Sequence, residues 1–148
     1  MQNLFKNRKE IEMRCKQADA CKEEYKLLIS AETEQEWDTV IKRHIIWGIR
    51  KKILKTNIEI RLLEKYGVKI IEKDCKIEIK EDEIYIILSG NIEVTQSVGE
   101  CFAYNKATIN VIQSGGGCFA YNKATINVIQ SGGVCYGYNE ATINYIET

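Results

Sequence analysis

The C-terminal half of the chain repeats one segment with a period of 17 residues. The segment "CFAYNKATINVIQSGG" occurs without substitution at residues 101–116 and 118–133, and a third copy, "CYGYNEATINYIE", begins at Cys135. A short unit of fixed period cannot bury its apolar side chains alone, so neighbouring units must stack on one another. The repeat therefore predicts a solenoid in which each period forms one coil.

Each period contains two strand-like runs separated by turns. "ATINVI" alternates between apolar and polar residues, "CFAY" is a second apolar run, and Asn-Lys and Gln-Ser-Gly-Gly lie between them. A weaker copy, "VTQSVGECF", precedes the identical ones at residues 94–102. We therefore predict about four coils, over residues 77–93, 94–110, 111–127 and 128–144, in a rod of about 19 Å.

Two observations set the fold class. A period of 17 is a multiple of neither five nor six, which disfavours pentapeptide solenoids and left-handed hexapeptide helices and favours a right-handed parallel β-helix. The apolar residues of residues 1–70 follow helical periodicity instead. The predicted fold is α+β, with a helical N-terminal region over residues 1–70 that caps the first coil of a β-solenoid over residues 71–148.

One half of each coil has a recognisable relative. The segment "AYNKATIN", at residues 103–110 and 120–127, resembles the A-Y-x-N-A-T-V-x units of uncharacterised β-helical repeat proteins common in gut bacteria and their phages. The resemblance covers about the last 60 residues, where the other half-coil, "VIQSGGGCF", is one residue longer and rich in glycine. It implies a β-helical fold and a mobile-element context, and it carries no activity.

The cysteines of the repeat form one column, at Cys101, Cys118 and Cys135. Thiolates bind zinc and iron–sulfur clusters, but a zinc site needs four convergent ligands, whereas one column of a solenoid points the same way at successive levels. We expect a buried ladder of small side chains and no metal or cofactor. Because no apolar run resembles a secretion signal or a membrane span, we expect a cytoplasmic protein whose six cysteines are free thiols.

Threonine and asparagine alternate with the apolar residues of "ATINVI". If Ile109 and Val111 point into the coil, Thr108 and Asn110 must point outward, because side chains alternate along a strand. The resulting array is similar to the flat threonine faces of ice-binding β-helices, and ladders of hydrogen bonds along the surface are the alternative. The columns are Thr108, Thr125 and Thr142, and Asn110, Asn127 and Asn144.

An aromatic column repeats beside the Asn-Lys turn, at Tyr104, Tyr121 and Tyr138. Its rings either stack in the core or lie exposed as a strip, and an exposed strip would be a binding surface. The asparagine after each tyrosine is expected to adopt the left-handed backbone of the turn. We assign the tyrosine and threonine columns as the candidate surface of the solenoid.

Helical periodicity predicts three helices in the N-terminal region. Thr33 and Glu36 have the spacing of a capping box, which marks the start of the second helix. Gly48 inside that helix indicates close packing, and Gly67 suits the position after the end of the third. The predicted helices span residues 5–30, 33–54 and 56–67.

The net charge of the chain is zero, but the two halves of the chain carry net charges of opposite sign. Residues 1–70 hold 16 Lys/Arg and 11 Asp/Glu, a net of +5, while residues 71–148 hold 5 and 10, a net of −5. A basic patch at the end of the second helix either complements the helix C-terminus or contacts nucleic acid or an acidic protein. The patch comprises Lys42, Arg43, Arg50, Lys51, Lys52 and Lys55.

Catalytic motifs are missing from the sequence, which contains no phosphate-binding loop, nucleophile elbow, zinc-binding H-E-x-x-H or dinucleotide fingerprint. The only histidine, His44, lies on the predicted apolar helix face beside Trp47 and is expected to be a packing residue. The acidic run at residues 81–83 separates two predicted strands and is expected to be a solvated, hairpin-like turn. We therefore expect no enzymatic activity.

The third copy of the repeat differs from the first two, most visibly by tyrosine for phenylalanine at Tyr136, glutamate for lysine at Glu140 and tyrosine for valine at Tyr145. Few residues follow it, and uncovered edge strands pair with other chains. We predict that two C-terminal coils stack in a two-fold dimer, with these three residues at its edge.

Together these features predict a non-enzymatic protein-binding protein from a phage or mobile element. By analogy with other proteins of phages and mobile elements, we expect a homodimeric inhibitor of a host defence complex such as a CRISPR nuclease. A structural or assembly β-solenoid of a phage and an ice- or glycan-binding solenoid are the alternatives. The expected partner is a host protein or nucleoprotein complex, with direct nucleic-acid contact left open and no membrane.

Overall fold

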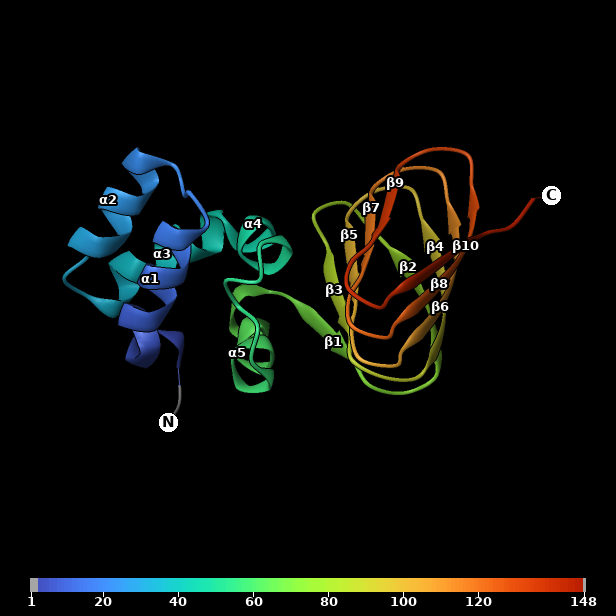
Figure 1. Cartoon of the computed structure of the whole chain (residues 1–148), viewed down its shortest axis with the longest axis horizontal. Coiled ribbons are helices and arrows are strands. Elements are labelled where there is room, and N and C mark those ends of the chain that lie inside the picture. The colour runs from blue at the N-terminus through green and yellow to red at the C-terminus, as the bar shows by residue number, and fades with distance from the viewer. Residues whose placement is uncertain (1–2, 148) are drawn as a thin grey trace. The chain divides into compact units, whose positions relative to one another are not determined.

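The computed structural model describes residues 3–147, which divide into two units (Figure 1). Met1–Tyr66 is the helical unit, and Gly67–Thr148 is the solenoid. The sequence places the division after residue 70, but strand β1 (Lys69–Ile71) already pairs with β3 (Ile84–Ile87). Strand structure therefore begins earlier than the sequence repeat indicates.

The segment predicted as one helix over residues 5–30 forms two helices. Asp19 takes a left-handed conformation (φ 56°), and the amide of Ala20 donates to the carbonyl of Cys15, which closes α1 and turns the chain into α2. Aspartate visits that conformation more readily than most residues, so the break has a local cause. The elements of the unit are η1 (Leu4–Asn7), α1 (Arg8–Gln17), α2 (Lys22–Ser30), α3 (Glu34–Arg43), α4 (Ile45–Arg50), α5 (Asn57–Leu62) and η2 (Leu63–Tyr66).

The second predicted helix begins where the sequence indicates but is interrupted. Both hydrogen bonds of the capping box between Thr33 and Glu36 are present at the start of α3. At His44 the backbone leaves helical geometry (φ −116°, ψ 27°), so that α3 and α4 are separate helices. A Cβ added to Gly48 would lie in ordinary contact distance, 3.4 Å, of Cδ1 of Leu54, where the chain after α4 packs against that helix.

The third predicted helix is present as α5 continued by η2, and it ends at Gly67 with φ 88°. A capping box between Thr56 and Glu59 starts it. The carboxylate of Glu59 is buried and also pairs with the guanidinium of Arg14, so this contact joins the first long helix of the unit to the last.

The solenoid consists of two five-stranded sheets in which every strand pair is parallel (Figure 1). The sheets have the orders β1-β3-β5-β7-β9 and β10-β8-β6-β4-β2, and each coil contributes one strand to each sheet. There are thus five coils rather than the predicted four, because β1 and β2 form a first coil whose sequence has diverged from the repeat. The remaining strands are β2 (Cys75–Ile79), β4 (Asn91–Gln96), β5 (Glu100–Ala103), β6 (Thr108–Gln113), β7 (Gly117–Ala120), β8 (Thr125–Gln130), β9 (Val134–Gly137) and β10 (Thr142–Tyr145).

The turn at residues 81–83 is a corner of a coil and not the predicted hairpin. The strands that flank it, β2 and β3, lie in different sheets. Asp82 takes a left-handed conformation (φ 62°), and Glu83 pairs with Lys69 and accepts a hydrogen bond of 2.7 Å from the amide of Lys80. The acidic run therefore closes a turn, and Glu83 is held by the local contacts of that turn.

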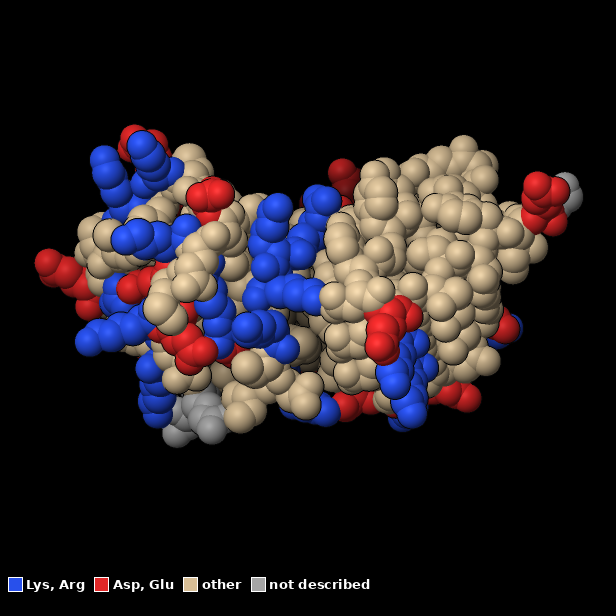
Figure 2. Space-filling model, viewed as in Figure 1, with Lys and Arg blue, Asp and Glu red and all other residues tan. Residues whose placement is uncertain are grey.

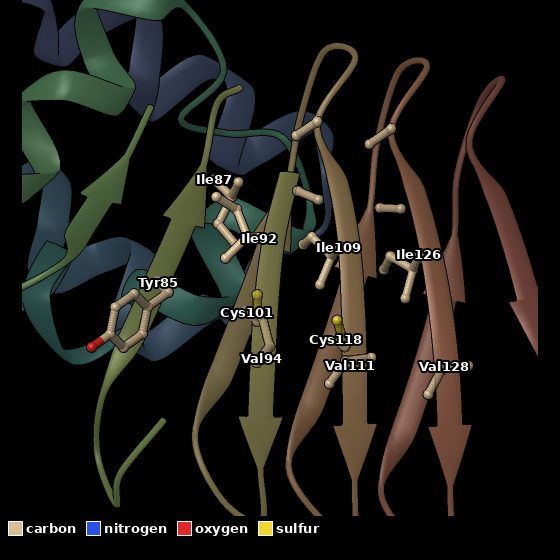
Figure 3. Close-up of a cluster of buried hydrophobic side chains, with 14 of the residues drawn as sticks. Tyr85, Ile87, Ile92, Val94, Cys101, Ile109, Val111, Cys118, Ile126 and Val128 are labelled. Atoms are coloured by element: carbon tan, nitrogen blue, oxygen red, sulfur yellow. The ribbon is translucent and has the colours of Figure 1, made fainter. Parts of the chain in front are cut away.

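Side chains from both sheets meet in a continuous apolar interior (Figure 3). Cys101 and Cys118 are paired in register and point inward from one sheet, and Val111 and Val128 point inward from the other. Hydrogen bonding between stacked thiols, together with burial, raises the pKa of Cys118 well above its usual range. The cysteine column is thus part of the core, and residues 3–147 contain no group of three or more His, Cys, Asp or Glu side chains arranged to hold a metal.

Candidate functional site

The candidate functional site is the last coil of the solenoid, which consists of β9 and β10 and which we call the open end. β9 pairs with β7 and β10 pairs with β8, while no strand within the described residues pairs with their other edges. Such edges carry unpaired backbone N–H and C=O groups, which pair readily with another strand. Large exposed apolar side chains gather on the same coil, at Val134, Tyr136, Tyr138, Tyr145 and Ile146.

Tyr145 occupies an inward-facing position of the open end. It is in register with Val128, which is fully buried in the coil below, yet 62% of Tyr145 is exposed. Its hydroxyl donates to the backbone carbonyl of Cys135 at 3.4 Å. The substitution of tyrosine for valine in the third repeat therefore places a large aromatic side chain at the uncovered end of the core, linked across it to β9.

Tyr136 is the last member of a stack of aromatic rings. The ring centroids of Phe102 and Phe119 are 5.2 Å apart, and those of Phe119 and Tyr136 are 6.1 Å apart. Phe102 and Phe119 are buried, but Tyr136 is half exposed because no further ring of residues 3–147 stacks on it. Glu140 lies in the turn between β9 and β10, where its carboxylate is 3.9 Å from Nζ of Lys123. It therefore belongs to the corner of the coil, beside the strand edges.

The tyrosine column is not the exposed strip that the sequence left as one possibility. Tyr121 lies between Tyr104 and Tyr138, with ring centroids 5.0 Å away on each side, so both of its faces are covered. Tyr104 and Tyr121 are buried, and burial raises the pKa of Tyr104 above its usual range. Only Tyr138, in the open end, presents a substantial exposed surface. Each tyrosine is followed by an asparagine with φ near +59°, as the sequence predicts for this turn.

The outer face of the sheet that contains β6, β8 and β10 carries three uncharged ladders. The Nδ2 of Asn127 donates to Oδ1 of Asn110 at 2.9 Å, and the Nδ2 of Asn144 donates to Oδ1 of Asn127 at 2.8 Å. A shallow hollow of about 340 Å³ lies between this asparagine ladder and a ladder of isoleucines, and Lys76 and Glu93 of the earlier coils also line it. Sequence reasoning missed the isoleucines, although alternation along the strand predicts them. The other two ladders on this face are Thr108, Thr125 and Thr142, and Ile112, Ile129 and Ile146.

The basic patch divides between two helix ends. Lys42 and Arg43 end α3, and Arg43 is paired with Glu24 of α2 at 3.0 Å. Arg50 ends α4, and Lys51, Lys52 and Lys55 follow it in the loop before α5. Figure 2 shows lysines and arginines gathered on the visible face of the helical unit, whereas the visible face of the solenoid is mostly uncharged. The patch is thus two basic segments, at the ends of α3 and α4, and Arg43 of the first segment pairs with a carboxylate.

His44 lies between α3 and α4, lines an apolar cavity together with Trp47, and also contacts a carboxylate of α2. Its Nε2 lies 2.9 Å from Oε2 of Glu24, and its side chain is 40% exposed. The hydrogen bond with His44 and the nearby charge of Arg43 lower the pKa of Glu24. Glu24 also lines this cavity of the helical unit, which sequence reasoning missed because its residues come from four helices and two loops.

Neither a protein-family model nor a curated protein nor a solved structure matches the chain. Among residues 3–147, no helix is both long and apolar enough to cross a membrane. The function proposed for the chain therefore rests on the geometry of the solenoid and of the helical unit.

Proposed function

We propose that the chain is a non-enzymatic binding protein that acts as a homodimer joined through the open end. The observation that carries this proposal is the pair of unpaired strand edges on β9 and β10, flanked by exposed tyrosines. A two-fold axis across the end of the solenoid would place the end strands of two copies antiparallel. Both edges of both copies would then be paired in one closed assembly, which removes the exposed edges.

The side chains of the open end fit such an assembly. Tyr136 and Tyr145 expose large aromatic surfaces, and aromatic residues are enriched in the buried centres of interfaces. Glu140 lies at the corner of the same coil, where it adds a single negative charge at the rim. A dimer would stack these aromatic surfaces against their copies and keep the charge in contact with water.

We further propose that the dimer inhibits a host defence complex of the nucleoprotein type, such as a CRISPR nuclease, in the host cytoplasm. Basic segments at the ends of α3 and α4 support a partner with phosphate or carboxylate groups, since Lys and Arg dominate contacts with nucleic acid. An inhibitor that acts by binding needs a stable surface and no catalytic group. The solenoid and the helical unit both offer such surfaces. Whether the contact reaches nucleic acid directly is an outcome of the test below.

A second candidate function is supported by the outer face with the threonine, asparagine and isoleucine ladders. None of its ladder residues on β6, β8 and β10 is charged, and their spacing repeats from coil to coil. A regular uncharged surface is suited to ice or to a neutral glycan. Thermal hysteresis in freezing solution and sedimentation with insoluble polysaccharides would test this role, and a Thr125→Lys variant should remove either activity.

The deciding experiment for the first proposal combines solution mass with capture. Light scattering across micromolar concentrations should give the mass of a dimer. Affinity capture from bacterial lysate, with and without nuclease treatment, should recover one stoichiometric nucleoprotein complex. A monomer at all concentrations would overturn the homodimer. Recovery of virion proteins, or growth into high-order oligomers, would replace the inhibitor with a phage assembly role.

A further inference from the structure

The helical unit contains a cavity that the proposed function does not use. Its volume is about 130 Å³, and it lies among α1, α2, α3, α4 and the chain that follows α4. Buried apolar side chains form its inner wall, and Glu24 and His44 are polar residues that also line it. The inner wall includes Cys15, Leu28, Ile41, Ile53 and Leu54.

The volume sets the size of a ligand. A dry apolar cavity of about 150 Å³ accepts benzene in a protein engineered to contain one, and the cavity here is only slightly smaller. A cavity of this volume has room for a single aromatic ring. Burial raises the pKa of Cys15 to about 11, which is consistent with an apolar inner wall that keeps this thiol neutral.

The carboxylate of Glu24 sets the polar chemistry. It receives three hydrogen bonds, two from Nη1 of Arg43 at 3.1 and 3.0 Å and one at 2.9 Å with Nε2 of His44. A carboxylate offers about four lone-pair positions, so one acceptor position remains. Arg43 already balances the charge of Glu24, so a charged ligand of either sign would lose its hydration in the cavity without gaining an unbalanced opposite charge from this pair. A neutral group with one O–H donor satisfies the remaining acceptor.

We propose that this cavity binds a small neutral phenol, with its ring among the apolar side chains and its hydroxyl donating to Glu24. The site depends on the helical unit alone and is independent of the proposed dimer. Trp47 lines the cavity, whereas Trp37 does not, so ligand binding can be followed by the fluorescence of one of the two tryptophans.

The test is a titration of the full chain with phenol, toluene and benzoate, followed by the fluorescence of a Trp37→Phe variant. Phenol should bind at least tenfold more tightly than toluene, because the hydroxyl meets a charged acceptor, and benzoate should not bind. Saturating phenol should also slow the alkylation of Cys15, whose side chain lies in the inner wall. Equal affinity for phenol and toluene, or no change in Trp47 fluorescence, would overturn the proposal.

Two variants and one control complete the experiment. Glu24→Leu should reduce phenol binding to the level of toluene, and Ala20→Phe, which fills the cavity from its rim, should abolish the binding of both. Glu23→Leu removes the neighbouring exposed carboxylate of α2 and should leave both affinities unchanged. Circular dichroism should show that each variant retains its helices. A Glu24→Leu protein that is folded and binds phenol as tightly as the parent would refute the role of Glu24.

Discussion

The guanidinium of Arg14 and the carboxylate of Glu59 form a buried ion pair, with Nη1 of Arg14 2.8 Å from Oε1 and 2.9 Å from Oε2 of Glu59. The same nitrogen donates to the carbonyl of Ile53 at 2.8 Å, and the amides of Lys55 and Thr56 donate to Glu59. Loss of Glu59 would leave the buried guanidinium with only the largely exposed carboxylate of Glu10 as its ion partner, which is more costly than loss of an exposed pair.

We predict that Glu59→Gln lowers the free energy of unfolding of the helical unit by about 3 kcal/mol at neutral pH. Tryptophan fluorescence during urea unfolding measures this, because both tryptophans, Trp37 and Trp47, lie in that unit. Glu64→Gln changes an exposed carboxylate of the same unit and is the matched control. A Glu59→Gln protein as stable as the control would contradict the role of the ion pair.

The same pair predicts a dependence on pH. Burial raises the pKa of Glu59, but the backbone amides of Lys55 and Thr56 and the charge of Arg14 outweigh it and hold the pKa below 4.5. The stabilisation by Glu59 is therefore complete above pH 4.5 and is lost as the pH falls through the lowered pKa. The difference in unfolding free energy between the parent and Glu59→Gln should shrink in acid, and a constant difference would exclude the linkage.

How far the fold follows from the sequence depends on the kind of signal. Strand, turn and repeat follow from periodicity, since alternation fixes which residues face inward. The first coil was not counted because its sequence does not match the repeat, although the strand before residues 81–83, which is β2, follows from alternation. The breaks at Asp19 and His44 depend on single backbone conformations within otherwise regular apolar stripes. Such local events leave little trace in a pattern averaged over several turns.

The glycines show what only the structure adds. The sequence identifies Gln-Ser-Gly-Gly as a turn, but the reason for consecutive glycines is contact between coils. A Cβ on Gly115 would lie 2.2 Å from the carbonyl oxygen of Ser97 in the coil before it, and Gly116 has φ 77°. The same contrast holds for the open end. The substitutions in the third repeat can be read from the sequence, whereas the position of Tyr145 over the end of the core follows only from the strand register.

A third prediction concerns Gln113, whose side chain is buried between coils. Its Nε2 donates to the carbonyl of Val134 at 2.9 Å and to Oε1 of Gln96 at 3.2 Å, while its own Oε1 accepts from Gln130. We expect Gln113→Ala to destabilise the solenoid by about 2 kcal/mol, because it leaves these groups without partners. Faster amide hydrogen exchange in β6 and β8 would report this.

Gln130→Ala is the matched control for that experiment, because Gln130 occupies the same column one coil later and is exposed. It removes one hydrogen bond to the buried Oε1 of Gln113, whereas Gln113→Ala removes three hydrogen bonds of the ladder. Its effect on exchange should therefore be much smaller. Equal effects at the two positions would show that the buried ladder adds no stability beyond that of an exposed one.

A fourth prediction uses the identity of the repeats. Deletion of residues 101–117 removes one whole coil and joins identical sequence contexts, so the remaining coils should stack as before. We expect a folded protein with a smaller free energy of unfolding and unchanged signals from the helical unit. Deletion of residues 109–117 removes half a coil and moves every later strand to the opposite sheet, so the solenoid should unfold. Small-angle scattering and circular dichroism distinguish these outcomes, and two equally folded deletions would refute the coil as the structural unit.

The last prediction separates assembly from partner binding. Tyr145→Asp places a charge at the uncovered end of the core, and Tyr136→Asp does so at the end of the aromatic stack, so each should shift the proposed dimer to monomer by at least tenfold in dissociation constant. Reversal of Arg50, Lys51 and Lys52 to glutamate should leave the dimer intact and weaken capture of a nucleoprotein partner, with a smaller salt dependence. Light scattering and capture on the same preparations measure both properties. If the charge reversal weakened the dimer, or if neither tyrosine variant did, assembly would have to lie on a different surface of the molecule.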